Sequence, residues 1–66
     1  MDALYQSRLE GLSEQIDNYL WLHHDTGSLS AAQRNHLKEL CDTIVCFGEV
    51  GKQWAKQGME LYKQTA

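Results

Sequence analysis

Six side chains in this sequence belong to types that bind metals or act as nucleophiles and bases. They are His23, His24, Asp25, His36, Cys41 and Cys46. Zinc sites use ligands at recognisable spacings, such as two cysteines separated by two residues or two histidines four positions apart on a helix. Neither spacing occurs, and no motif pairs a nucleophile with a base and an orienting group. We therefore expect no metal, no cofactor, no catalytic residue and no enzymatic activity.

The two cysteines also indicate the cellular compartment in which the protein works. Cys41 and Cys46 are five positions apart, which on one helix separates their Cα atoms by about 8 Å and puts them on different faces. A disulfide needs less than about 7 Å, so we expect free thiols and a reducing, cytoplasmic location. No apolar run is longer than the four residues from Tyr19 to Leu22. This length is far below the roughly 20 residues of a membrane helix, so we expect no membrane-spanning helix, and we also expect no cleaved signal peptide.

Three lysines near the end of the chain suggest an alternative function in nucleic-acid binding. Lys52, Lys56 and Lys63 fall near one face of the last helical turns, and phosphate binding needs clustered basic side chains. The whole chain has a formal net charge of −3. Residues 1–26 contain one arginine and five acidic residues, a net charge of −4 that would repel a nucleic-acid backbone. We therefore expect no nucleic-acid partner and keep a small dimeric RNA- or DNA-binding regulator as the alternative.

Turn chemistry divides the chain into two predicted helices. Gly27 suits the left-handed conformation that follows many helix ends. Ser30 reads as an N-cap, and Gln33 three residues later completes a capping box. With Asp2 as a further N-cap, we predict a first helix over about 3–24 and a second that starts near residue 31.

Apolar residues recur at alternating spacings of three and four along both segments, which is the seam of a helix bundle. The predicted core and dimer residues are Leu9, Leu12, Ile16, Tyr19, Leu37, Leu40, Ile44, Phe47 and Trp54.

Two glycines decide how many helices follow the turn. Gly48 and Gly51 each disfavour a helix interior by about 1 kcal/mol relative to alanine, and a break there would give a three-helix bundle. The apolar repeat nevertheless passes through this segment without a phase shift or a polar loop. We predict one long helix over about 31–64, with small inner residues that let Tyr5 approach closely.

The predicted all-α fold is an antiparallel helical hairpin that occupies residues 1–66 as one domain. The first helix would be about 33 Å long and the second about 50 Å. The part of the second helix after about Ala55 would then extend beyond the end of the first helix, and half of each apolar seam would remain exposed to water. We therefore predict a homodimer in which two hairpins form a four-helix bundle.

Protein binding is the function that these features favour. Trp21 lies outside the seam of the first helix, and tryptophan and tyrosine are enriched at interface hot spots. The residues predicted to bind a partner protein are Trp21, Trp54, Met59, Leu61 and Tyr62.

In architecture the chain resembles the small all-helical proteins encoded by bacteriophages and plasmids. The resemblance rests on the 66-residue length, the helix restart at Ser30-Ala31-Ala32-Gln33 and the two unequal seams. The resemblance implies a hairpin protein of the bacterial cytoplasm that binds a host protein and acts as a steric inhibitor or as an adaptor. In size the chain also resembles plasmid RNA-binding hairpin dimers, although it lacks a comparable basic face.

Overall fold

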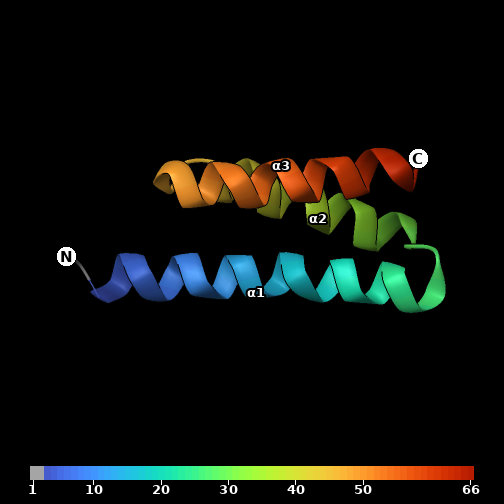
Figure 1. The fold of residues 1–66 in the computed structure, drawn as a ribbon, viewed down its shortest axis with the longest axis horizontal. Helices are drawn as coiled ribbons and strands as arrows, with labels where there is room; N and C mark the ends of the chain where they lie inside the picture. Colours follow the sequence, from blue (N-terminus) through green and yellow to red (C-terminus); the bar gives the residue numbers. More distant parts are fainter. Residues whose placement is uncertain (1–2) are drawn as a thin grey trace.

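The computed structural model describes residues 3–66. Within them the chain forms three α-helices: α1 over Ala3–Thr26, α2 over Ala31–Ile44 and α3 over Gly48–Gln64. Figure 1 shows α1 alongside the pair formed by α2 and α3, with the α1–α2 connection at one end and the α2–α3 connection at the other. The all-helical class is confirmed, and the first helix, predicted over about 3–24, extends to Thr26. The predicted N-cap at Asp2 lies outside the described residues.

The connection between α1 and α2 follows the predicted turn chemistry. Gly27 has a φ of +76°, and its N–H donates to the carbonyl oxygen of His23 at 2.7 Å. The Ser30 hydroxyl accepts from the Gln33 N–H at 3.1 Å, while the Gln33 side chain accepts from the Ser30 N–H at 2.8 Å. The capping box is therefore confirmed, and it begins α2 at Ala31.

The prediction of one helix over 31–64 is wrong. α2 ends at Ile44 and the chain reverses, so that α3 runs back beside α2. Gly48 has a φ of +73°, a backbone conformation that other residues adopt only with strain. The unbroken apolar repeat was misleading because a repeat reports which faces are apolar, while helix continuity depends on backbone dihedral angles.

Gly51 provides the second condition for this reversal. It is buried, and a Cβ there would collide with the Ile44 carbonyl oxygen and lie 2.9 Å from the Phe47 Cβ. Only a glycine lets the first turn of α3 approach the last turn of α2 this closely. Tyr5 does approach the glycines, but at the turn: its ring centroid is 5.0 Å from that of Phe47, and its hydroxyl lies beside Gly48.

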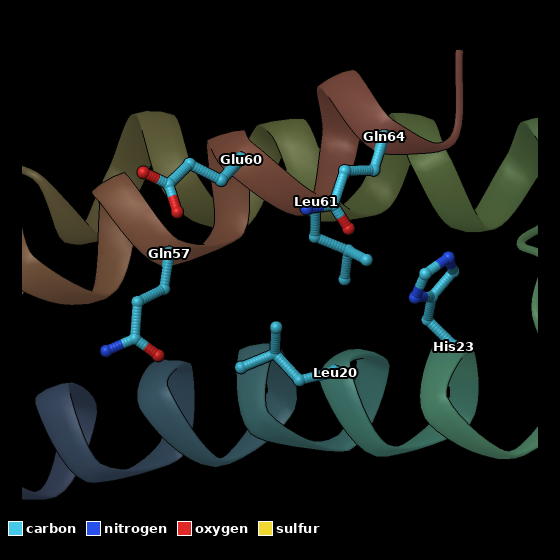
Figure 2. Close-up of a pocket in the computed structure, with 6 residues that line it drawn as sticks. All are labelled: Leu20, His23, Gln57, Glu60, Leu61 and Gln64. Atoms are coloured by element: carbon cyan, nitrogen blue, oxygen red, sulfur yellow. The ribbon is translucent and has the colours of Figure 1, made fainter.

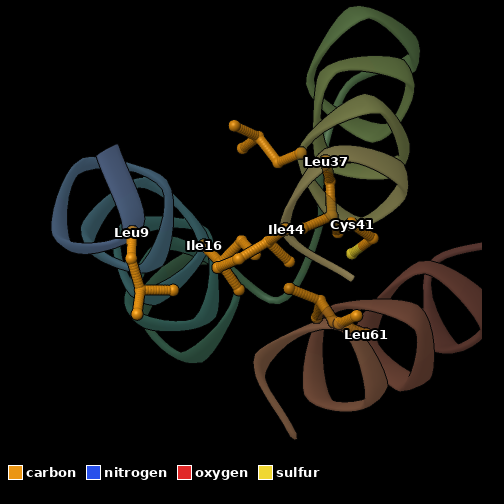
Figure 3. Packing of buried hydrophobic residues seen from close by; sticks show 8 residues of the cluster. Leu9, Ile16, Leu37, Cys41, Ile44 and Leu61 are labelled. Carbon is orange, nitrogen blue, oxygen red and sulfur yellow. The ribbon is translucent and has the colours of Figure 1, made fainter. Parts of the chain in front are cut away.

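All three helices contribute side chains to one core. Figure 3 shows Ile16 of α1, Ile44 of α2 and Leu61 of α3 pointing into the space between the helices. Of the predicted core residues, five are buried and four are partly buried and packed against them. The buried ones are Leu9, Ile16, Leu37, Leu40 and Ile44, and the partly buried ones are Leu12, Tyr19, Phe47 and Trp54.

This three-helix arrangement removes the predicted C-terminal overhang. Because α3 folds back, the segment after Ala55 lies beside the C-terminal half of α1, where Leu61 is 3% exposed. The unpaired seam that motivated the four-helix dimer is occupied by α3 of the same chain. The homodimer stays a prediction, which sedimentation at micromolar protein concentration checks. No helix within residues 3–66 is long and apolar enough to cross a membrane.

Candidate functional site

Trp21 lies on the outer surface of α1 next to a shallow hollow. The hollow has a volume of about 280 Å³ and is lined by Asp17, Leu20, Trp21 and His24. These positions follow the i, i+3, i+4, i+7 pattern, so α1 alone presents them on one side. The Trp21 side chain is 60% exposed, and its ring meets the edge of His24 at a centroid distance of 5.6 Å. We call this feature the Trp21 hollow.

A second hollow lies between α1 and α3. It has a volume of about 230 Å³, and its lining residues are Leu20, His23, Gln57, Glu60, Leu61 and Gln64. Figure 2 shows Leu20 and Leu61 pointing toward each other from the two helices, with His23 near one end. We call it the α1–α3 hollow. Leu20 lines both hollows, so together they form a continuous surface with an apolar centre.

Only two of the five predicted partner-binding residues lie at this surface. Trp21 lies at it and Leu61 forms its floor, whereas Trp54, Met59 and Tyr62 are partly buried against the core. Tyr62 is also occupied by an internal contact. The Arg34 guanidinium carbon lies 4.3 Å from the Tyr62 ring centroid, and Arg34 also donates to the Tyr62 carbonyl oxygen at 3.2 Å.

Other exposed large apolar side chains lie toward the opposite end of the bundle, where α1 begins and α2 joins α3. They are Leu4, Tyr5, Val45 and Val50, with exposures of 66%, 37%, 41% and 51%. This apolar end is separated from the Trp21 hollow by most of the length of α1 (Figure 1).

The residues of metal-ligating type are spread over the structure. Tyr19 Oη and His36 Nδ1 are 2.6 Å apart and join α1 to α2. His24 Nδ1 lies 3.4 Å from the Asp25 carboxylate beside the α1–α2 turn. Within residues 3–66, no three side chains of His, Cys, Asp or Glu come together in a group that could hold a metal ion.

The two thiols are free and lie in different environments, Cys41 being buried and Cys46 exposed. Burial, together with a smaller contribution from the nearby Asp42 carboxylate, raises the pKa of Cys41 from 9.0 to about 11. Because the thiolate is the reactive species, we expect iodoacetamide to alkylate Cys46 rapidly at neutral pH and Cys41 only on unfolding. Peptide mass spectrometry after timed labelling distinguishes the two sites, and equal rates would contradict the buried position of Cys41.

The same raised pKa has a consequence for stability. A pKa that is higher in the folded state means that folding favours the neutral thiol. This contribution is fully present below pH 9.0 and is lost as the pH rises toward about 11. Urea unfolding of wild type and Cys41→Ser over this range should show a steeper alkaline loss for the wild type.

The three lysines of the alternative function lie exposed along α3. Lys52 Nζ is 3.7 Å from the Glu49 carboxylate one turn earlier, so one of the three charges faces an opposite charge on the same helix. Nucleic-acid binding through Lys52, Lys56 and Lys63 stays a prediction.

Sequence reasoning identified Trp21 but not its neighbourhood. From the sequence, Leu20 reads as the widened end of a helix seam, His23 as a polar residue of the turn, and Gln57 and Gln64 as part of a solvated face. Only the return of α3 brings these two groups to the same hollow. Comparison with protein-family models, curated proteins and solved structures finds no match for this chain.

Proposed function

We propose that this protein is a non-enzymatic binding module whose Trp21 hollow docks on another protein and sterically blocks or bridges it. The observation that carries the proposal is the 60% exposure of the Trp21 side chain beside a hollow that Leu20 extends toward α3. A core position for this residue would have placed it between helices, where Ile16 and Tyr19 lie.

The energetics of tryptophan support this role. Burial of apolar surface gains about 25 cal/mol per Å², and tryptophan is among the residues most enriched at interface hot spots. Leaving Trp21 in water forgoes that gain in the free protein, and a partner that covers the ring recovers it. The adjacent hollow gives such a partner a shaped surface to fill.

The proposal extends to the setting in which the protein acts. The free thiols of Cys41 and Cys46 support a reducing compartment such as the cytoplasm. The resemblance to small phage- and plasmid-encoded helical proteins supports a host protein as the target. The mechanism is steric, because the bound bundle covers a functional surface of that target.

An affinity capture with two matched variants tests the proposal. Immobilised wild type, Trp21→Ala and Val50→Ala would each be incubated with lysate of the cell in which the protein acts, and the bound target then purified for titration. Trp21 and Val50 are both large exposed apolar residues, 60% and 51% exposed, toward opposite ends of the bundle. Surface substitutions change stability by only about 0.5 kcal/mol, so both variants should remain folded.

We expect Trp21→Ala to weaken binding of the purified target by about 2 kcal/mol or more and Val50→Ala to leave it unchanged. If Val50→Ala weakens binding and Trp21→Ala does not, the interface lies at the apolar end of the bundle instead. A target bound equally well by all three proteins would remove Trp21 from the interface.

A further inference from the structure

We propose that the partner surface that covers Trp21 is basic, an arginine- or lysine-rich segment of another protein that lies along α1. This inference rests on the proposed function and names the chemistry of the partner. It comes from the charges that share the outer face of α1 with Trp21.

The outer face of α1 carries acidic residues on both sides of Trp21. Glu10, Glu14, Asp17, Trp21 and Asp25 follow each other at intervals of four, three, four and four residues, which keeps them on one side of an α-helix. That side points away from the buried residues Leu9 and Ile16, with the half-buried Asp17 at its edge. We call it the α1 outer face. Arg8 falls on another side of the helix, because it lies two positions before Glu10 and two positions correspond to a rotation of about 200°.

Three of these carboxylates, Glu10, Glu14 and Asp17, form no ion pair within residues 3–66, whereas Asp25 lies beside His24. The ion pairs found between residues 3 and 66 join His24 to Asp25 and Lys52 to Glu49, and Glu10 accepts only a weak contact from Gln6 at 3.5 Å. Glu10 and Glu14 are separated by four positions and Glu14 and Asp17 by three. Like charges at these separations destabilise a helix, so the free protein carries an unfavourable arrangement that cationic side chains would relieve.

Trp21 itself suits a basic partner. An arginine guanidinium or a lysine ammonium is attracted to the face of an indole ring, and Asp17 lines the same hollow as Trp21. A cationic side chain over the ring would therefore find a carboxylate within one helical turn. The face extends about 22 Å from Glu10 to Asp25, which accommodates a helix or an extended segment with several basic residues.

A peptide titration tests the proposal without knowledge of the natural target. Fluorescein-labelled oligo-arginine would be titrated with the protein at low salt and followed by fluorescence anisotropy, with oligo-glutamate as the control peptide. The first variant is Glu14→Gln with Asp17→Asn. The matched control is Glu39→Gln with Asp42→Asn, which removes two exposed carboxylates three positions apart on α2 and changes the net charge equally.

We expect the α1 double variant to weaken oligo-arginine binding roughly three- to tenfold, and Trp21→Ala to weaken it as well. The α2 double variant should bind like the wild type. Because Glu14→Gln and Asp17→Asn remove like-charge repulsion, the α1 variant should unfold at a temperature no lower than that of the wild type, so its loss of binding cannot come from unfolding.

Several outcomes would overturn the assignment. Equal weakening by both double variants would mean that oligo-arginine responds to net charge alone. Binding of oligo-glutamate would show that the α1 outer face prefers acidic segments to basic ones. If the wild type self-associates and the variant Lys52→Gln with Lys56→Gln does not, the basic partner on the α1 outer face would be a second copy of this chain. If the acidic variants are without effect while the captured target still needs Trp21, the proposed function stands and only the basic character of the partner fails.

Discussion

Replacement of Ile16 by alanine should remove about 2–5 kcal/mol from the free energy of unfolding. Ile16 is 0% exposed and lies where the three helices meet. A Cβ added to Gly58 of α3 would lie 3.5 Å from the Ile16 Cγ2 and 3.4 Å from the Leu37 Cδ1 of α2. The truncation leaves a cavity that cannot close unless all three helices shift. Urea unfolding followed by circular dichroism measures the loss.

The size of the chain makes this effect large. A 66-residue domain has a total stability of only about 3–10 kcal/mol, so Ile16→Ala removes much of the free energy that keeps the protein folded. Ile16→Val, which should cost about 0.5–1.5 kcal/mol, gives a measurable intermediate. Trp21→Ala is the control on the same helix and should change stability by no more than about 0.5 kcal/mol. Equal losses at positions 16 and 21 would contradict the packing of α1.

Replacement of Gly58 by alanine should lower stability by up to about 2 kcal/mol, although alanine is the better helix former. Alanine gains about 1 kcal/mol in helix propensity, but overpacking a core costs about 1–3 kcal/mol. The added Cβ would collide with the Cys41 Sγ and lie 3.4 Å from the Leu37 side chain. Cys41 is 2% exposed and cannot swing into solvent, so the overpacking dominates. Thermal unfolding should show a midpoint lower by about 4–8 °C per kcal/mol.

Two variants separate this collision from the general effect of removing a glycine. Gly11 lies within α1, and a Cβ there would have nothing within 4 Å, so Gly11→Ala should raise stability by about 0.5–1 kcal/mol. In a Cys41→Ala background, the Cβ of Gly58→Ala finds space and its cost should shrink by at least about 0.5 kcal/mol. A Gly58→Ala protein as stable as Gly11→Ala would show that α2 and α3 are farther apart than the structure has them.

Local signals in the sequence predicted part of the fold. The end of α1, the capping box at Ser30 and Gln33 and the start of α2 follow from interactions between residues within a few positions of one another. The apolar repeat predicted the core for a similar reason: Leu9, Ile16, Leu37 and Ile44 lie on the apolar sides of their own helices whatever those helices pack against.

The candidate site was only partly predictable. The place of Trp21 outside the seam follows from the spacing on α1, and its side chain is exposed, but the adjoining α1–α3 hollow depends on residues distant in the sequence. The α1–α3 hollow needs Leu20 and Leu61 side by side, two residues that a long straight helix would have kept apart. The predicted C-terminal overhang is wrong for the same reason, because that prediction required the segment that forms α3 to continue away from α1.

The sequence by itself therefore determined which segments are helical, which side of each is apolar and where the first turn falls. Only the tertiary structure decided that the chain reverses at Gly48. A glycine can continue a helix or adopt a positive φ at similar cost, so its own preference does not choose between them. The choice comes from the burial that α3 gains against α1 and α2, with Leu61 and Ala55 in the core, and that gain exists only when all three helices are in place.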